Sequence, residues 1–203
     1  SFMGFDFKVG RGVLIPRDDT EVVVNLCIDF LKNRTDKKTV DLCSGSGAIA
    51  VALDKISGAE VTAVEIDETA FSYLETNVKE NNSSVKPVMA DALEICDTFA
   101  DGELDLIVSN PPYIKSADIE TLQKEVQLEP RLALDGGEDG YNFYREIVSR
   151  WSRKLKKGGA LAFELGENQA DAVKALMADK GFSDFKISLD FGGVQRAIIG
   201  TLL

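Results

Sequence analysis

The sequence predicts an α/β fold in which helices cover a mostly parallel β-sheet. Two observations lead to this prediction. Short apolar runs rich in β-branched residues alternate with longer amphipathic runs along the chain. A glycine-containing turn at 43–47 also joins one apolar run directly to a helical pattern, as in doubly wound α/β folds. With 203 residues, 44% of them apolar and 28% charged, the chain has the size and composition of one compact domain.

The predicted elements follow from the period of the apolar residues and from the Gly- or Asp-containing loops between them. Strands are expected at 39–42, 60–65, 85–89, 104–109, 160–165, 185–189 and 196–201. Helices are expected at 20–32, 46–56, 68–80, 141–156 and 168–180. This alternation is the order of a parallel sheet with crossover helices.

Local signals refine the first third of the chain. Residues 2–15 alternate apolar and polar side chains around three glycines, which predicts a short N-terminal β-hairpin. Asp18 and Glu21 have the spacing of a capping box, which would start the helix at 20–32. Asp67 is placed to cap the helix that follows the second strand.

The composition excludes several kinds of chemistry. The chain has no histidine, which removes Ser-His-Asp and Cys-His nucleophiles and the commonest metal ligand. Cys27, Cys43 and Cys96 lie far apart without a Cys-x-x-Cys spacing, so we expect no metal site, no disulfide framework and a cytoplasmic location. The net charge of −11 disfavours binding to nucleic acid. No apolar run approaches the roughly 20 residues of a membrane span, so we expect no membrane partner.

The turn after the first strand is a candidate cofactor site. Its small residues would let a ligand approach the backbone, and the uncovered N–H groups at the next helix start could face polar ligand groups. Gly45, Gly47 and Ala50 also fit the Gly-x-Gly-x-x-Ala form of the dinucleotide fingerprint. A plain strand-turn-helix connection is the alternative, because it needs glycine as well. The candidate cofactor-binding residues of this turn are Asp41, Cys43, Ser44, Gly45, Ser46 and Gly47.

Carboxylates at the ends of the next two strands extend this site. Glu65 ends the second strand at the sheet edge where open α/β folds bind ligands, so its carboxylate could accept both hydroxyls of a ribose. Asp91 and Ala92 follow the third strand, where a carboxylate and a backbone N–H could read an adenine edge. A solvated turn is the alternative for this second pair. Together these residues predict a ligand of the adenosine type.

The fourth strand ends at Asn110-Pro111-Pro112-Tyr113, the candidate catalytic turn. Two prolines terminate a strand because they remove backbone donors, so a rigid terminator is the alternative. If the Asn110 side-chain oxygen and the Pro111 carbonyl each accept one N–H, a planar amide or amine nitrogen is held with one face free. Tyr113 could cover that planar group with its ring. Asn110 would also border the cofactor site, since the two strands end at the same edge.

Four ordered signatures make the chain resemble the HemK/PrmC family of release factor glutamine methyltransferases over nearly its full length. The family signatures correspond to Gly-Val-Leu-Ile-Pro-Arg at 12–17 with Thr20 and Glu21, to 41–47, to Ser-Asn-Pro-Pro-Tyr-Ile at 109–114, and to 129–140. The last of these resembles the segment that closes the substrate side. It separates the family from generic methyltransferases.

This resemblance implies a Rossmann-like class I methyltransferase with a seven-stranded, mostly parallel sheet and an antiparallel last strand. It implies one domain over 1–203, without the family's helical N-terminal domain. The cofactor would be S-adenosyl-L-methionine, leaving as S-adenosyl-L-homocysteine, and the partner a peptide chain release factor whose Gly-Gly-Gln glutamine amide is methylated. By the same resemblance, Gly45, Gly47, Glu65, Asp91 and Ala92 serve the cofactor, and Asn110, Pro111 and Tyr113 the acceptor.

Two departures from the family pattern stand out. Cys43 and Ser44 occupy positions where the family often has Gly and Thr, and because both are small we expect little loss. Asp18 and Asp19 replace the more usual Pro-Glu, which affects contacts of that loop rather than cofactor binding.

Three other functions fit parts of the pattern. An adenine methyltransferase acting on nucleic acid could use the same Asn-Pro-Pro-Tyr geometry on an exocyclic amine, but the acidic composition argues against it. A nicotinamide dehydrogenase fits the glycine turn and leaves the Pro-Pro turn unexplained. A non-catalytic adenosylmethionine-binding module is the third. The charged residues Arg17, Glu21, Arg131 and Arg196 have either a functional role or a structural role as paired ions.

Overall fold

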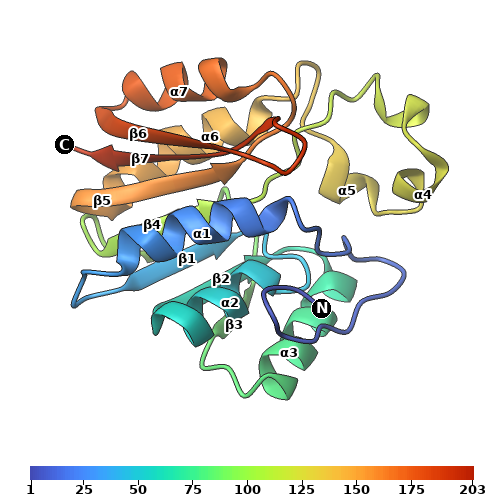
Figure 1. Cartoon of the computed structure of the whole chain (residues 1–203), viewed down its shortest axis with the longest axis horizontal. Coiled ribbons are helices and arrows are strands. Elements are labelled where there is room, and N and C mark those ends of the chain that lie inside the picture. Colours follow the sequence, from blue (N-terminus) through green and yellow to red (C-terminus); the bar gives the residue numbers. More distant parts are fainter.

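The computed structural model describes residues 1–203, apart from the side chain of Glu125. Seven strands of the described chain form one sheet in the order β3-β2-β1-β4-β5-β7-β6 (Figure 1). The strands are β1 (Lys38–Leu42), β2 (Glu60–Glu65), β3 (Lys86–Met89), β4 (Leu104–Ser109), β5 (Leu155–Glu164), β6 (Phe182–Leu189) and β7 (Gln195–Leu202). Only β7 runs antiparallel to its neighbours within this sheet. The predicted sheet, with its antiparallel last strand, is confirmed.

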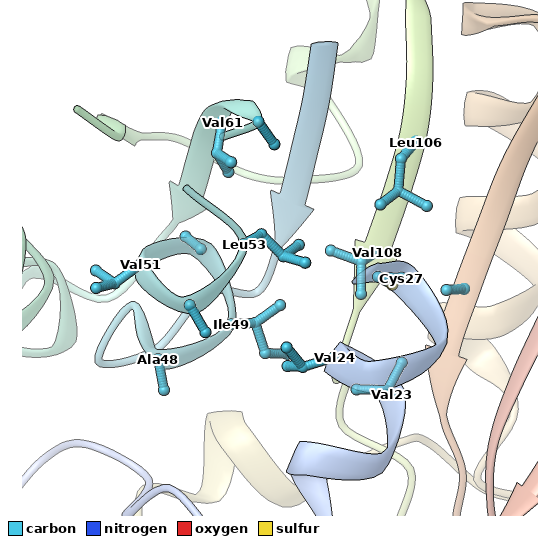
Figure 2. Close-up of a cluster of buried hydrophobic side chains, with 14 of the residues drawn as sticks. Val23, Val24, Cys27, Ala48, Ile49, Val51, Leu53, Val61, Leu106 and Val108 are labelled. Atoms are coloured by element: carbon cyan, nitrogen blue, oxygen red, sulfur yellow. The ribbon is translucent and has the colours of Figure 1, made fainter. Parts of the chain in front are cut away.

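Helices cover both faces of the sheet. The helices α1 (Thr20–Leu31), α2 (Ala48–Ser57) and α3 (Glu68–Glu80) pack on one face, and α6 (Asn142–Trp151) and α7 (Ala170–Ala178) on the other. Consecutive residues of β4 divide between the two faces, because strand side chains alternate: Leu106 and Val108 join the first core, Ile107 the second. Figure 2 shows the first core, where Val24 of α1 and Ile49 of α2 lie near Val108.

A long connection between β4 and α6 carries short helical turns beyond one end of the sheet. These are η2 (Ile119–Thr121), α4 (Lys124–Gln127) and α5 (Arg131–Leu134), the last two of which stand apart from the other helices in Figure 1. Two further turns, η1 (Ile95–Thr98) and η3 (Ser152–Lys154), precede β4 and β5. In the described residues we find no helix whose length and hydrophobicity would suit a membrane span.

Two local predictions near the N-terminus are wrong. The hairpin expected over residues 2–15 is reduced to one antiparallel bridge between Phe2 and Phe5. The segment instead packs on α3, where Asn77 holds the Lys8 backbone through both its N–H (2.7 Å) and its C=O (2.9 Å). The capping box is also absent among the described residues: α1 has no side-chain cap, and Glu21 accepts a hydrogen bond from the Met3 N–H (2.8 Å). Hydrogen bonds between residues far apart in the sequence therefore replace both local motifs.

The helix expected at 141–156 ends early. Trp151 closes α6, η3 follows, and β5 begins at Leu155 rather than at 160. Lys154 is buried and donates to the Phe99 carbonyl and the Asp101 carboxylate, both at 2.8 Å, which turns the chain toward the sheet. Gly159 lies within β5, where a Cβ atom would come within 3.2 Å of the Leu104 carbonyl. Gly159 suggests a loop when only the sequence is considered. In the structure, the close approach of the neighbouring strand explains why a glycine stands there.

Candidate functional site

A cavity of about 190 Å³ lies at the carboxyl ends of β1, β2, β3 and β4. This is the edge at which the sequence places the cofactor residues. Of the predicted residues, Cys43, Ser44, Gly45, Ser46, Glu65, Asp91, Ala92, Asn110 and Pro112 line the cavity. The site is thus assembled from four strand ends.

The glycine turn adopts backbone conformations that explain its composition. Gly45 and Gly47 have φ angles of 54° and 83°, in the left-handed region that glycine enters without steric cost. Gly47 caps α2, which begins at Ala48 rather than at the predicted 46. Cys43 also has a positive φ of 59°, a conformation that costs a non-glycine residue about 1–2 kcal/mol. The expectation that a small side chain at this position loses little therefore overlooked the backbone.

Glu65 clamps the turn to the end of β2. Its Oε2 accepts a hydrogen bond from the Gly45 N–H (2.7 Å), and its Oε1 accepts from the N–H groups of Ile66 and Asp67 (2.9 Å each). A carboxylate has about four acceptor positions, so about one is left for a ligand. Asp67 caps α3 by accepting from the Ala70 N–H (2.9 Å), as predicted.

The loop after β3 is held in place from two sides. Asp91 accepts a hydrogen bond from the Leu93 N–H (2.7 Å), and the buried Trp151 indole donates to the Ala92 carbonyl (2.8 Å). Both Asp91 and Ala92 border the cavity. The fixed loop can present its carboxylate and backbone to a ligand without first becoming ordered.

Two predicted cofactor residues, Asp41 and Gly47, lie outside the cavity lining. Asp41 is fully buried in β1, and neither of its carboxylate oxygens has a hydrogen-bond partner among the described residues. Burial raises the pKa of Asp41 to about 8. Burial also raises the pKa of the Cys43 thiol far above its usual range, with the Glu65 charge acting in the same direction. These two groups are therefore largely uncharged near neutral pH.

The candidate catalytic turn at 110–113 is anchored by its neighbours. The Ser109 hydroxyl donates to the Leu42 carbonyl (2.7 Å), which ties the end of β4 to that of β1. On the far side, the Gln169 amide donates to the Tyr113 carbonyl (3.1 Å). A Cβ atom on Gly136 would lie 2.8 Å from the Tyr113 Cα, and one on Gly140 would lie 2.6 Å from the Tyr113 carbonyl oxygen. Glycines in the 135–140 loop therefore let two backbones meet and fix the turn.

A second cavity, of about 240 Å³, adjoins the first. Asn110 lines both cavities, whereas Tyr113 lines only the second. Glu164, the last residue of β5, lies in the second cavity and accepts a hydrogen bond from the Tyr113 hydroxyl (3.2 Å). Burial, reinforced by the Glu164 charge, raises the pKa of Tyr113 well above its usual range. Burial likewise raises the pKa of Glu164 to about 7.

The four charged residues with two alternative roles all have protein partners. Arg17 donates to both oxygens of Glu129 (2.8 and 2.9 Å), Arg131 pairs with Asp135 (3.2 Å) and Arg196 with Asp190 (3.0 Å). Glu21 accepts from the Met3 backbone, as described above. Arg17 and Arg196 nevertheless also line the second cavity. Arg17 and Arg196 therefore have structural partners, and their position in the cavity lining also allows contact with a ligand.

Sequence reasoning missed several cavity residues. Leu14 lines both cavities and Leu132 lines the first. Both fall within the family signatures at 12–17 and 129–140, but neither lies near a strand end, so neither was predicted as a site residue. Glu164 had a local signal, because it lies one residue before the end of the strand predicted at 160–165, at the same edge as Glu65.

The sheet order and the position of the cavity define a Rossmann-like class I methyltransferase fold. A methyltransferase from Pyrococcus furiosus has this fold, with a TM-score of 0.71 and 22% identity, covering 98% of this chain and 89% of that one. The human METTL16 catalytic domain, solved with an RNA hairpin, gives a TM-score of 0.78 at 14% identity, covering 99% and 76%. The family model of the methyltransferase small domain matches residues 18–137.

Comparison with curated relatives identifies the family within the methyltransferase class. Release factor glutamine methyltransferases from Clostridium acetobutylicum and Geobacter sulfurreducens are 38% and 42% identical, covering 98% and 99% of this chain and 70% of each relative. The Fusobacterium nucleatum enzyme is 39% identical, and the chain spans 56% of its length. The chain belongs to the release factor glutamine methyltransferase family.

Proposed function

We propose that this chain transfers a methyl group from S-adenosyl-L-methionine to the side-chain amide nitrogen of a glutamine in a peptide chain release factor, within its Gly-Gly-Gln motif. Family membership supports the reaction class. The observation that carries the proposal is that two cavities meet at Asn110, which is the polar residue among the three described residues that line both, with Leu14 and Ala133. One cavity suits the methyl donor and the other the acceptor, so Asn110 stands where the methyl group would pass.

The first cavity suits adenosylmethionine. Gly45 leaves open space where a Cβ atom would project, so a ligand can approach the backbone there. The remaining acceptor position of Glu65 suits one ribose hydroxyl, fewer than the two expected from the sequence. Asp91 borders the same cavity, where it would bind the adenine. A human METTL16 structure of the same fold contains S-adenosylhomocysteine.

The second cavity suits a planar amide. No hydrogen bond within the described part of the chain occupies the Asn110 side-chain oxygen or the Pro111 carbonyl, so both are free to accept the two N–H groups of a glutamine amide. Of the two residues, Asn110 lines the cavity, whereas Pro111 is buried and lines neither cavity. Tyr113, fixed through its hydroxyl by Glu164, can cover the amide plane with its ring. The amide lone pair, otherwise delocalised into the carbonyl, is then held facing the donor.

The chemistry requires positioning more than acid–base groups. The donor supplies an electrophilic sulfonium methyl group. The residues of the catalytic turn hold the nitrogen in line with it and stabilise the charge that develops there with prearranged carbonyl dipoles. The nitrogen becomes acidic only when methylated, and water then takes its proton, which is consistent with a chain that has no histidine.

The free state of Cys27, Cys43 and Cys96 supports a cytoplasmic location.

The test is methyl transfer from labelled adenosylmethionine to a purified release factor. The same factor with its Gly-Gly-Gln glutamine changed to alanine, and a DNA duplex, serve as alternative acceptors. We expect label on the intact factor only. Label on the duplex would favour an adenine methyltransferase, against which the net charge of −11 argues.

An Asn110→Ala variant separates catalysis from cofactor binding. We expect it to bind adenosylmethionine, measured by calorimetry, and to lose methyl transfer by about 100-fold or more, because one of the two amide acceptors is gone. Unchanged transfer by this variant would contradict the proposed role of the turn.

A further inference from the structure

Glu164 is a buried carboxylate with one oxygen left over. Its side chain lines the second cavity, and the residue is only 4% exposed. Oε1 accepts the Tyr113 hydroxyl, but Oε2 has no hydrogen-bond partner among the described residues. Leaving a buried carboxylate oxygen without a partner is costly, so such an atom in a cavity points to a ligand that donates to it.

The sheet places Glu164 beside Asn110. Ser109 of β4 pairs with Phe163 of β5, so Asn110 and Glu164 occupy the next position on adjacent parallel strands. The backbone of Glu164 is held by the buried Tyr144 hydroxyl, which donates to its carbonyl (2.9 Å). The carboxylate therefore stands at a fixed place next to the residue where the two cavities meet.

We propose that Glu164 is a substrate-binding residue whose Oε2, as a carboxylate, accepts a hydrogen bond from a main-chain N–H of the acceptor peptide. This inference rests on the proposed function, since the acceptor is the peptide that enters the second cavity. Asn110 and Pro111 would then hold the reacting amide, and Glu164 would hold the chain that carries it.

The described charged residues around Glu164 do not pair with its free oxygen, which leaves that oxygen to a ligand. Arg196 faces Glu164 from β7, but it pairs with Asp190 (3.0 Å) and Asp19 (3.7 Å) and forms no ion pair with Glu164 in the described chain. Burial, reinforced by the Asp19 charge, raises the pKa of Glu164 to about 7, while Thr20, Tyr113 and Arg196 favour its charged form and limit the rise. The carboxylate therefore forms within the working pH range.

The test is steady-state kinetics of Glu164→Gln with purified release factor and saturating adenosylmethionine. We expect the KM for the factor to rise about tenfold or more, the loss typical of a hydrogen bond to a charged acceptor. The Kd for adenosylmethionine and the Tm should stay at the wild-type values. Glu103→Gln removes one acidic charge at the opposite edge of the sheet, where Glu103 pairs with Lys38. It should leave the KM unchanged.

A pH series adds a readout that loss of packing would not change. The wild-type KM for the factor should fall as pH rises through about 7 and the Glu164 carboxylate forms, whereas Glu164→Gln should show no such fall. If the glutamine variant has a lowered Tm, Glu164→Asp replaces it, and this variant should keep the fall because it keeps the carboxylate.

The outcomes separate the two proposals. A wild-type chain that methylates the factor, with a glutamine variant of equal KM or equal pH profile, overturns the role of Glu164 and leaves the proposed function standing. A wild-type chain that binds adenosylmethionine and methylates no factor overturns both.

Discussion

Replacing Glu65 by glutamine tests the clamp that joins the glycine turn to β2. The carboxylate accepts three backbone N–H groups, from Gly45, Ile66 and Asp67. In Glu65→Gln, the amide oxygen can take over the position of Oε1, but the NH₂ group then faces the Gly45 N–H, and two donors cannot pair. One hydrogen bond is lost and the other two lose their charged acceptor.

The expected loss follows from these contacts. A hydrogen bond to a charged group contributes about 1.5–3 kcal/mol, so the free energy of unfolding should fall by roughly 2–3 kcal/mol. For a chain of this size, the Tm should fall by roughly 4–12 °C, since each kcal/mol corresponds to about 2–4 °C. The affinity for adenosylmethionine should fall as well, because the freed turn must be ordered again on binding.

Urea denaturation and calorimetric titration measure the two effects. The control is Glu60→Gln, on the same strand, where an exposed carboxylate pairs with Lys86 (2.8 Å). Surface ion pairs contribute about 0–1 kcal/mol, so this variant should stay close to wild type. Equal losses of unfolding free energy in the two variants would refute the clamp.

Three further predictions concern the same turn. Gly47→Ala should cost more unfolding free energy than Gly45→Ala, because both strain a positive φ but only at Gly47 would the new Cβ overlap Leu74, adding roughly 1–3 kcal/mol in urea denaturation. Cys43→Gly should be more stable than Cys43→Ala by about 1 kcal/mol, since only glycine relieves the left-handed strain; equal stabilities would contradict this. Asp41→Asn should gain stability relative to wild type as pH rises from about 4 to 8, because over that window the unfolded wild-type chain releases the Asp41 proton, whereas the folded chain, in which burial raises the pKa to about 8, still holds it; a constant difference between the two proteins would exclude this.

Periodicity was sufficient to predict most of the sheet, because strands such as Leu104–Ser109 are buried at every position and mostly apolar. The start of β6 was missed because the strand is irregular there: Asp184 has a positive φ of 49°, and the register shifts between Ser183 and Lys186. The N-terminal hairpin failed because Asn77, on a distant helix, binds the Lys8 backbone instead. Such pairing has no signature in the local sequence.

The site residues likewise divide into those that could be predicted from the sequence and those that could not. Motif residues at strand ends, such as Glu65 and Asn110, could be predicted because the carboxyl ends of parallel strands converge. Leu14 and Leu132 reach the cavity through long connections whose path depends on the whole fold. The hydrogen-bond partners of Arg17 and Arg196 could not be read from the sequence, since an ion pair between distant residues leaves no pattern.

One wall serves both cavities. The segment from α4 to α5 contributes Pro130 and Leu132 to the first cavity, Val126 and Glu129 to the second, and Ala133 to both. A ligand that displaces this segment from one cavity also changes the shape of the other cavity. If the two binding events are coupled in this way, thermodynamic linkage makes the coupling reciprocal: the donor alters the affinity for the acceptor by the same factor as the acceptor alters that for the donor.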